Sequence, residues 1–167
     1  LPWAIWHLLW RARRQPEYLR HWRERFGLYG AAPWNADASR APTLWIHAVS
    51  VGETRAAQPL VAALRARHPA LRILMTHMTP TGRATSAALF GDTVTRRYLP
   101  YDTPGAMRRF VRHFRPVAGI IMETELWPNL VATCKARNVP LLLANARLSD
   151  KSARRYARFP RLTRAAL

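Results

Sequence analysis

Three glutamates stand directly after apolar runs in a chain that has few acids. Glu53 is the last residue of the short segment 49–53, which follows the first of these runs. Glu123 and Glu125 follow a second run, which ends at Met122. Asp and Glu together number only 9, against 27 Lys and Arg. Because an ionised carboxylate in a cleft can take the proton of a sugar hydroxyl, these positions predict chemistry rather than solubility.

Each carboxylate also has a purely structural interpretation. Glu53 follows Gly52 at the start of an expected helix, whose positive end keeps a carboxylate ionised, so it can equally serve only as a cap. Glu123 and Glu125 alternate along extended chain, so their side chains should point apart, one toward a crevice and one toward neighbouring backbone. For either of them, a buried ion pair with Arg147 is the structural alternative.

The segment Thr79-Pro80-Thr81-Gly82 is a second candidate binding element. Its small polar residues resemble a phosphate-binding loop, but it has neither the lysine nor the spacing of a Walker motif. The chain also lacks a Gly-x-Gly-x-x-Gly motif. A plain turn is therefore the default interpretation of this segment.

Apolar runs and helical patterns alternate along most of the chain. The runs are continuous, which is typical of strands buried on both faces of a parallel sheet. Five such units predict an α/β fold with a doubly wound, Rossmann-like parallel sheet. We expect strands at residues 43–49, 71–76, 93–99, 117–122 and 139–144, and helices at 54–67, 82–90, 103–114, 128–137 and from 150 onward. Because parallel strands gather their C-terminal ends at one edge, the polar segments should line one crevice.

The charge balance favours an anionic partner. A formal net charge of +18 and a pI of about 11.8 suit nucleic acid, anionic lipid or a phosphorylated substrate. The histidines show no metal-ligand spacing, so His47 and His77 are interpreted as polar fillers, and no metal or cofactor is expected. Cys134 is the only cysteine and is expected to pack as a small apolar residue. The arginine-rich stretch 108–113 is either a nucleic-acid contact or, more commonly, a solvated helix face.

Residues 1–30 form an expected basic, aromatic helical segment that stops near Gly27, and residues 31–42 form a linker. The first ten residues include three tryptophans, and arginines follow at positions 11, 13 and 14. This run is shorter than the roughly 20 apolar residues that span a bilayer. Interfacial tryptophan with arginine beyond it is the pattern of a membrane anchor that ends on the cytoplasmic side. We interpret the run in this way, with an amphipathic helix docked on the domain as the alternative.

The chain resembles the N-terminal half of the 3-deoxy-D-manno-octulosonic acid (Kdo) transferases, the lipid A glycosyltransferases of Gram-negative bacteria. The resemblance covers nearly the whole chain and rests on five motifs in family order: Ser50-Val51-Gly52-Glu53-Thr54, Met78-Thr79-Pro80-Thr81-Gly82, Tyr98-Leu99-Pro100-Tyr101-Asp102, Met122-Glu123-Thr124-Glu125-Leu126-Trp127-Pro128-Asn129 and Asn145-Ala146-Arg147-Leu148-Ser149. It implies a B-type glycosyltransferase fold, with residues 1–30 as a membrane-proximal segment and residues 43–167 as the Rossmann-like acceptor-binding domain. The C-terminal donor-binding domain is expected beyond this chain, which alone should be inactive.

The resemblance also implies a reaction. An inverting transfer without a metal ion or other cofactor moves Kdo from CMP-Kdo to lipid IVA, the lipid A precursor, at the cytoplasmic face of the inner membrane. By the same matching, Glu53 is the general base toward the acceptor's 6′-hydroxyl, and Glu123 stabilises the transition state. The residues implied in substrate binding are Ser50, Gly52, Thr79, Thr81, Gly82, Glu125, Asn129, Asn145, Arg147 and Ser149. The implied partners are lipid IVA, CMP-Kdo and an anionic membrane surface, and not nucleic acid.

Two other functions compete with this interpretation. The high pI alone suggests a nucleic-acid-binding module, which predicts aromatic RNA contacts on an exposed sheet. A peripheral membrane-binding module without catalysis accounts for the N-terminal segment, but it has no use for Glu53 and Glu123 at strand ends.

Overall fold

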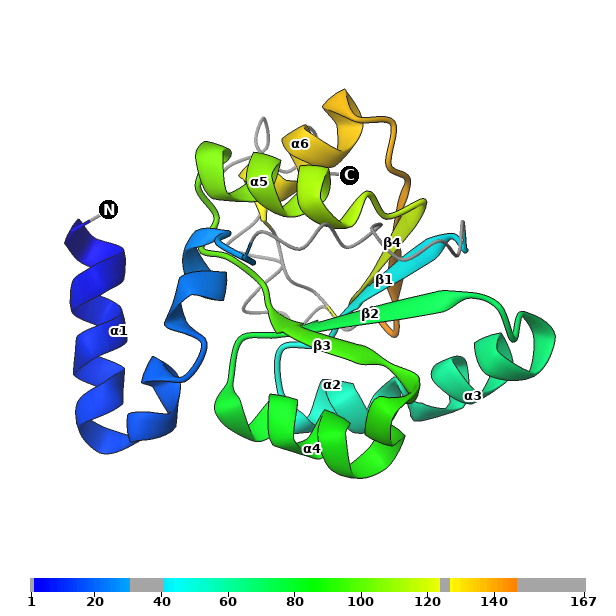
Figure 1. Cartoon of the computed structure of the whole chain (residues 1–167), viewed down its shortest axis with the longest axis horizontal. Coiled ribbons are helices and arrows are strands. Elements are labelled where there is room, and N and C mark those ends of the chain that lie inside the picture. The colour runs from blue at the N-terminus through cyan, green and yellow to red at the C-terminus, as the bar shows by residue number, and fades with distance from the viewer. Residues whose placement is uncertain (1, 31–40, 124–126, 147–167) are drawn as a thin grey trace.

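The computed structural model describes residues 2–30, 41–123 and 127–146, and for residues 2–4 and 7 the backbone alone. Its centre is a parallel five-stranded sheet in the order β3-β2-β1-β4-β5 (Figure 1). The strands are β1 (Thr43–His47), β2 (Arg72–His77), β3 (Thr95–Tyr98), β4 (Ala118–Met122) and β5 (Leu141–Ala144). This strand order is the Rossmann-type order, so the predicted fold class is confirmed.

Helices cover the sheet on both faces (Figure 1). One face carries α2 (Val51–Ala56), α3 (Gln58–Arg67) and α4 (Pro80–Phe90), with the short 3₁₀ turn η3 (Gly91–Thr93), and the other face carries α5 (Pro104–Phe114) and α6 (Pro128–Ala136). Alternate residues of β1 divide between two cores, because successive side chains of a strand point to opposite faces. Ile46 lies in the core under α3, while Trp45 packs with Phe110 of α5.

Some helix and strand boundaries differ from those that the sequence predicted. The helix expected at 54–67 is two helices, because the chain turns at Ala57 and Pro59 stands in the first turn of α3, where proline is tolerated. The helix before this break begins at Val51, and Ser50 is its N-cap. The strand expected to reach Val49 ends two residues earlier, at His47. The helix expected from residue 150 lies outside the described residues.

A glycine allows β1 and β4 to approach each other closely around a tryptophan side chain. Gly119 of β4 pairs with Trp45 of β1, and a Cβ atom on Gly119 would lie 2.5 Å from the indole ring. The same indole donates a hydrogen bond of 2.7 Å from Nε1 to Thr76 Oγ1 on β2. One buried tryptophan therefore ties the three central strands together.

The N-terminal segment is only partly the continuous helix that the sequence predicted. It comprises α1 (Pro2–Arg14) and two 3₁₀ turns, η1 (Pro16–Leu19) and η2 (Trp22–Phe26). Pro16 stops the α-helical path, because proline lacks the backbone donor and disfavours a helical residue before it. The predicted stop at Gly27 is confirmed, since this residue has φ 74° and a Cβ there would lie 2.8 Å from the Ala106 carbonyl oxygen.

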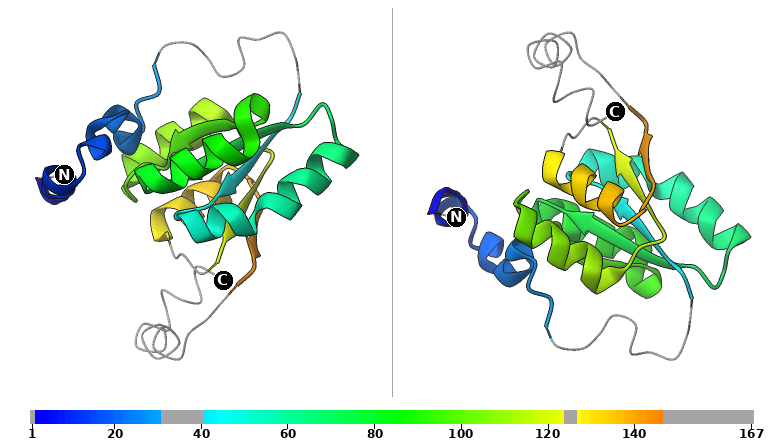
Figure 2. Two further views of the ribbon diagram at one scale, coloured as in Figure 1. Left: turned by 90° about the horizontal axis from the view of Figure 1, so that it is seen from below. Right: turned by 90° about the horizontal axis from the view of Figure 1, so that it is seen from above.

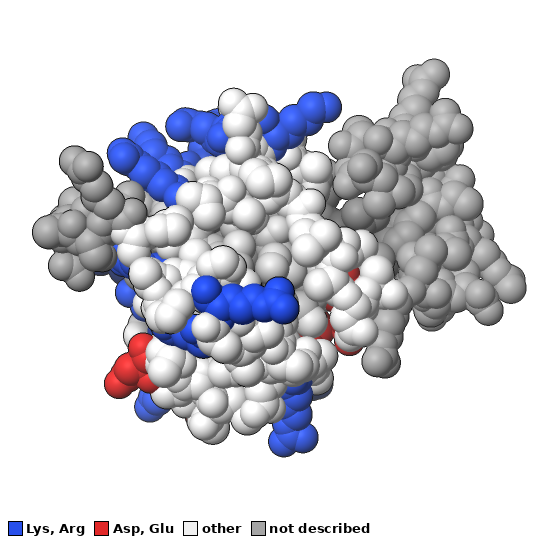
Figure 3. Space-filling model, turned by 90° about the vertical axis from the view of Figure 1, so that its right-hand side faces the viewer, with Lys and Arg blue, Asp and Glu red and all other residues white. Residues whose placement is uncertain are grey.

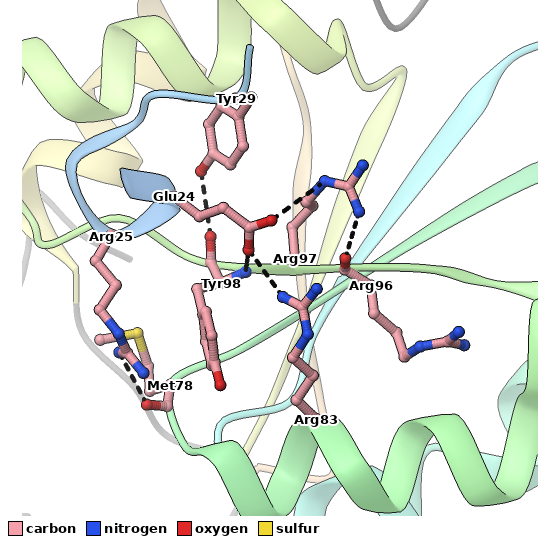
Figure 4. A network of polar contacts seen from close by, with 8 residues as sticks. All are labelled: Glu24, Arg25, Tyr29, Met78, Arg83, Arg96, Arg97 and Tyr98. Atoms are coloured by element: carbon pink, nitrogen blue, oxygen red, sulfur yellow. Dashed lines mark hydrogen bonds and ion pairs between the residues drawn. The ribbon is translucent and has the colours of Figure 1, made fainter. Parts of the chain in front are cut away.

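The turn η2 closes the free edge of the sheet. Tyr98 of β3 donates its backbone N–H to Glu24 Oε2 at 2.8 Å, and the Tyr29 hydroxyl donates to the Tyr98 carbonyl at 3.2 Å (Figure 4). Arg83 Nη1 forms an ion pair with the same carboxylate at 2.8 Å. Unpaired strand edges are prone to aggregation, so these contacts have a clear structural role. The segment 24–29 is thus part of the domain and cannot be removed as a mere tether.

The helix α1 lies at one end of the molecule, outside the layered core (Figure 2). Leu8 and Ala12 on its inner face pack against Tyr18 and Phe26 of the same N-terminal segment. Trp6 and other apolar side chains on its outer face are exposed. Among the described residues, no helix is both long and apolar enough to cross a membrane.

Candidate functional site

The two best catalytic candidates lie at the point where the strand order reverses. From β1 the chain continues to β2 and β3 on one side, and β4 and β5 lie on the other. Glu53 stands in the helix that follows β1, and Glu123 follows β4 directly. Because β1 and β4 are paired neighbours, their C-terminal ends are adjacent. Parallel α/β sheets bind ligands at such a switch point, so the sheet places both carboxylates where a ligand is expected.

Glu53 is held by the start of its own helix. Its carboxylate accepts hydrogen bonds from the Val49 backbone N–H at 2.7 Å and from the Ser50 hydroxyl at 2.9 Å. In return, Ser50 Oγ accepts a hydrogen bond from the Glu53 N–H at 3.5 Å. Serine at the N-cap with glutamate three residues later is the capping-box pattern. Glu53 therefore does help to cap its helix, as the structural interpretation predicted, and the same hydrogen bonds fix its carboxylate in place.

The surroundings of Glu53 make its carboxyl group hold a proton more firmly than an ordinary glutamate does. Burial raises its pKa, against the lowering effect of the hydrogen bonds from Val49 and Ser50, and the negative charge of Glu123 raises it further. The side chain is only 6% exposed. The two carboxylates are thus close enough to influence each other. A general base works best with a pKa near the working pH, so the shift is in the useful direction.

Glu123 has an unusual backbone conformation. Its φ is 60°, in the left-handed region, and its N–H donates to the Ala144 carbonyl at 2.9 Å. For residues other than glycine this conformation costs about 1–2 kcal/mol, and strain of this kind clusters at functional sites. The prediction that Glu123 and Glu125 alternate along extended chain is wrong at Glu123, because a left-handed residue interrupts the alternation. Glu125 lies outside the described residues.

The segment Thr79–Gly82 follows β2 and contacts the loop that follows β1. Thr79 caps α4 by accepting a hydrogen bond from the Gly82 N–H at 3.1 Å, and its hydroxyl donates to the Val49 carbonyl at 3.1 Å. A Cβ atom on Gly82 would lie 3.1 Å from that carbonyl oxygen and 3.3 Å from the Ser50 carbonyl carbon. A side chain at residue 82 would therefore press on the segment that carries Glu53, and glycine lets the α4 N-terminus lie close to it.

Replacement of Gly82 by alanine should destabilise the protein by about 1–3 kcal/mol, because the new methyl group would press on the backbone of Val49 and Ser50. The free energy of unfolding in urea measures the effect. Gly105→Ala is a matched control in the first turn of α5, where the new Cβ meets only the movable Arg109 side chain at 3.4 Å. Helix propensity should make that control neutral or more stable by up to about 1 kcal/mol. Equal effects of the two substitutions would contradict the close packing at Gly82.

Asp102 belongs to a motif that the sequence placed near the crevice, but it was given no role of its own. Its carboxylate accepts hydrogen bonds from the backbone N–H groups of Asn129 at 3.1 Å and Leu130 at 2.9 Å, so it caps α6 from another loop. The Asn129 side-chain amide donates to the Asp102 carbonyl at 2.9 Å. Asn129 thus positions the α6 N-terminus, and its substrate-binding role stays a prediction. Two features of the sequence could have indicated this contact: an acidic residue next to a strand end, and a proline at the start of a later helix.

The remaining predicted residues fall into two groups. Gly52, Thr81 and Asn145 are exposed, and Asn145 directly follows β5 with φ 52°, a conformation that asparagine tolerates well. Arg147 and Ser149 lie outside the described residues.

The strand histidines and the cysteine are packing groups, as predicted. His47 and His77 are fully buried, and burial is the main cause that lowers their pKa values, to about 3 and about 4. Each ring binds neighbouring β-strand groups through Nδ1: His47 contacts Thr76, and His77 contacts the Ala48 carbonyl. Burial raises the pKa of the Cys134 thiol to about 12, so this group stays protonated.

Comparisons with known proteins agree on one family. A family model described as 3-Deoxy-D-manno-octulosonic-acid transferase (kdotransferase) matches residues 20–167. The chain is 46% identical to the 3-deoxy-D-manno-octulosonic acid transferase of Haemophilus influenzae, over 87% of this chain and 33% of that protein. The enzyme of the same name from Bordetella pertussis is 45% identical, over 98% of this chain and 39% of that protein.

A plant protein is also similar. The probable 3-deoxy-D-manno-octulosonic acid transferase, mitochondrial, of Arabidopsis thaliana is 39% identical over 90% of this chain and 33% of that protein. The chain therefore spans about a third of the length of the curated relatives it matches.

Proposed function

The chain belongs to the 3-deoxy-D-manno-octulosonic-acid (Kdo) transferase family, and we propose that it forms the acceptor-binding half of an inverting glycosyltransferase that moves Kdo from CMP-Kdo to lipid IVA. The observation that carries the proposal is the placement of Glu53 and Glu123 at the switch point of the sheet. The donor is proposed to bind a second domain beyond Leu167.

In the proposed mechanism, Glu53 takes the proton of the acceptor's 6′-hydroxyl while the hydroxyl oxygen attacks the anomeric carbon of Kdo and CMP leaves. A primary alcohol is a poor nucleophile until a base removes its proton during attack. Val49 and Ser50 hold the base in position through the hydrogen bonds to its carboxylate. Departure of CMP leaves positive charge on the sugar, which the Glu123 carboxylate stabilises across the site.

The acceptor is proposed to lie along the edge formed by the strand ends. Exposed polar groups there, from Gly52, Thr81 and Asn145, are available to its sugars. The phosphates of lipid IVA need cations, and the chain has 27 Lys and Arg against 9 Asp and Glu. On the face seen in Figure 3, basic side chains are spread over the surface and acidic atoms are few. A nucleic-acid function has less support, because the central strands β1 and β2 are buried and offer no exposed aromatic side chains to bases.

The proposal is tested by incubating the complete transferase with CMP-Kdo and lipid IVA and measuring Kdo transfer by mass spectrometry. Transfer to lipid IVA, with little transfer to a dephosphorylated acceptor, is expected. A complete protein that folds but transfers no Kdo to any lipid A precursor would contradict the proposal.

The cytoplasmic face of the inner membrane is the proposed location, with α1 as the membrane contact. Trp6 stacks on Trp10 with ring centroids 6.3 Å apart, and both rings are exposed together with Leu9. Trp6→Ser combined with Leu9→Ser should lower binding to anionic vesicles about tenfold, because this apolar surface no longer enters the interface. Sedimentation with vesicles measures the loss.

Two features sharpen this membrane test. Deletion of residues 1–25 is unsuitable, since it also removes Glu24 and Arg25, which are buried in the domain. Val117→Ser is a matched control, because Val117 is 52% exposed and Leu9 is 54% exposed. Vesicle binding that drops equally in the control, or not at all in the α1 variant, would exclude α1 as the contact.

A further inference from the structure

A basic hollow lies beside the N-terminal segment, away from the switch point. It has a volume of about 460 Å³ and is lined by η2, by the Tyr29–Gly30 segment and by two arginines of the domain. Its cationic groups are Arg23 of η2, Arg83 of α4 and Arg97 of β3. Figure 4 shows two of them, Arg83 and Arg97, on either side of the Glu24 carboxylate.

The hollow has more positive than negative charge. Glu24 Oε2 accepts from Arg83 Nη1 at 2.8 Å, and Glu24 Oε1 lies 3.5 Å from Arg97 Nε. One carboxylate thus contacts two guanidinium groups, while three line the hollow, and the carboxylate is also held by the backbone N–H of Tyr98. Arg23 is exposed and has no ion-pair partner among the described residues. Guanidinium groups bind phosphate oxygens well, so the excess charge suits a phosphate.

The pKa of the adjacent His21 agrees with this excess of positive charge. Burial lowers the pKa of His21, and the positive charge of Arg83 lowers it further, while Glu24 only partly opposes the effect. His21 also lines the hollow. Arg83, Arg97 and Arg20 thus all disfavour a charge on His21, and Glu24 favours it.

The rim of the hollow is apolar. Trp22 and Leu28 line it and are 47% and 41% exposed. Of the ten large apolar side chains that are exposed in the described part of the chain, seven lie between residues 5 and 28. Free phosphate has no use for such a rim. RNA can stack on tryptophan, but it gains little from exposed leucine and isoleucine. A phosphate joined to acyl chains uses both features.

We propose that this hollow binds the headgroup phosphate of an anionic membrane phospholipid, with the lipid's glycerol and acyl part lying along Trp22 and Leu28. Arg23, Arg83 and Arg97 hold the phosphate oxygens. The binding deepens the membrane association proposed above and gives the domain a fixed orientation on the bilayer. It does not depend on Kdo transfer.

Vesicle binding of arginine variants tests the site. Arg23→Gln combined with Arg97→Gln should lower affinity for phosphatidylcholine vesicles that contain phosphatidylglycerol about tenfold, at an unchanged melting temperature. Arg108→Gln combined with Arg112→Gln is the matched control, since both residues are exposed on α5 and the charge loss is equal. The control should lose about threefold or less. Equal losses would mean that only overall charge matters and would overturn the proposal.

Protection from chemical modification tests the wild-type protein directly, so a destabilised variant cannot leave the question open. Phenylglyoxal modifies accessible arginines, and mass spectrometry locates the products. A soluble short-chain phosphatidylglycerol should protect Arg23 and Arg97, but not Arg108, while inorganic phosphate at the same concentration protects them weakly. Equal protection by phosphate, protection by RNA or lipid IVA but not by phosphatidylglycerol, or no protection would each overturn the proposal. Neither experiment uses CMP-Kdo, so its outcome is separate from that of the transfer assay.

Discussion

Glu53→Gln in the complete transferase is expected to lower kcat about 100- to 10,000-fold, the usual contribution of a general base. The amide cannot accept the proton of the 6′-hydroxyl. The fold should survive, because the glutamine carbonyl can still accept from the Val49 N–H, and the Ser50 hydroxyl can turn to accept from the amide. Initial rates of Kdo transfer and the melting temperature measure the two effects.

Ser50→Ala separates capping from catalysis. It removes the hydroxyl that caps α2 and contacts Glu53, and it should cost about 1 kcal/mol of stability. Its effect on kcat should be much smaller than that of Glu53→Gln. If Glu53→Gln leaves turnover nearly normal, or if it loses activity only by unfolding, then Glu53 is a cap and the base lies elsewhere.

The pH dependence gives a second test of the same assignment. Burial and Glu123 raise the pKa of Glu53, so the base becomes active at a higher pH than an ordinary glutamate would. The acidic limb of the kcat/KM profile should therefore lie above the usual glutamate range, and Glu123→Gln should move it to lower pH. The same raised pKa makes the folded protein less stable as the pH rises. The cost of ionising Glu53 in the folded protein is absent below its ordinary pKa, and it grows as the pH rises through the raised value.

The sequence predicted the layers of the fold well because they depend on local pattern. The apolar run 117–122 became β4, and the run 71–76 became β2 with a shift of one residue. Some failures have local causes, the helix breaks near Pro59 and Pro16, and others have long-range causes. The edge of β3 is closed by Glu24 and Tyr29, which lie about 70 residues earlier in the chain. No periodicity in either segment indicates that contact.

The candidate site was predictable in part for the same reason. Position after a buried strand was enough to select Glu53 and Glu123, because parallel topology brings such positions together. A capping role of Glu53 was also predicted, but Ser50 was not predicted as the N-cap, because the helix was expected to begin only at residue 54. Asp102 was not selected, since its partners Asn129 and Leu130 are distant in sequence. The left-handed backbone of Glu123 could not be foreseen, because sheet and loop contacts impose it against the residue's own preference.

Substitutions at Glu123 should separate turnover from stability. Glu123→Gln keeps the shape of the side chain and removes its charge, so kcat should fall about 10- to 1000-fold with little change in melting temperature. Glu123→Gly should lose at least as much activity and yet unfold at a higher temperature, because glycine adopts φ 60° without strain. The expected gain is about 0.5–1 kcal/mol, since relief of the left-handed strain exceeds the added chain entropy of glycine. Kinetics and urea unfolding measure both.

Asn145→Gly is the matched control, because Asn145 also has positive φ at a strand end. It should gain less stability, since asparagine tolerates this conformation better than glutamate does. A residue kept in a strained conformation that lowers stability has to contribute something else, and at this position the contribution is a carboxylate at the switch point. If instead Glu123→Gln unfolds the domain while Glu123→Gly stays active, then the side chain is a structural anchor, and Glu53 alone carries the chemistry of this half.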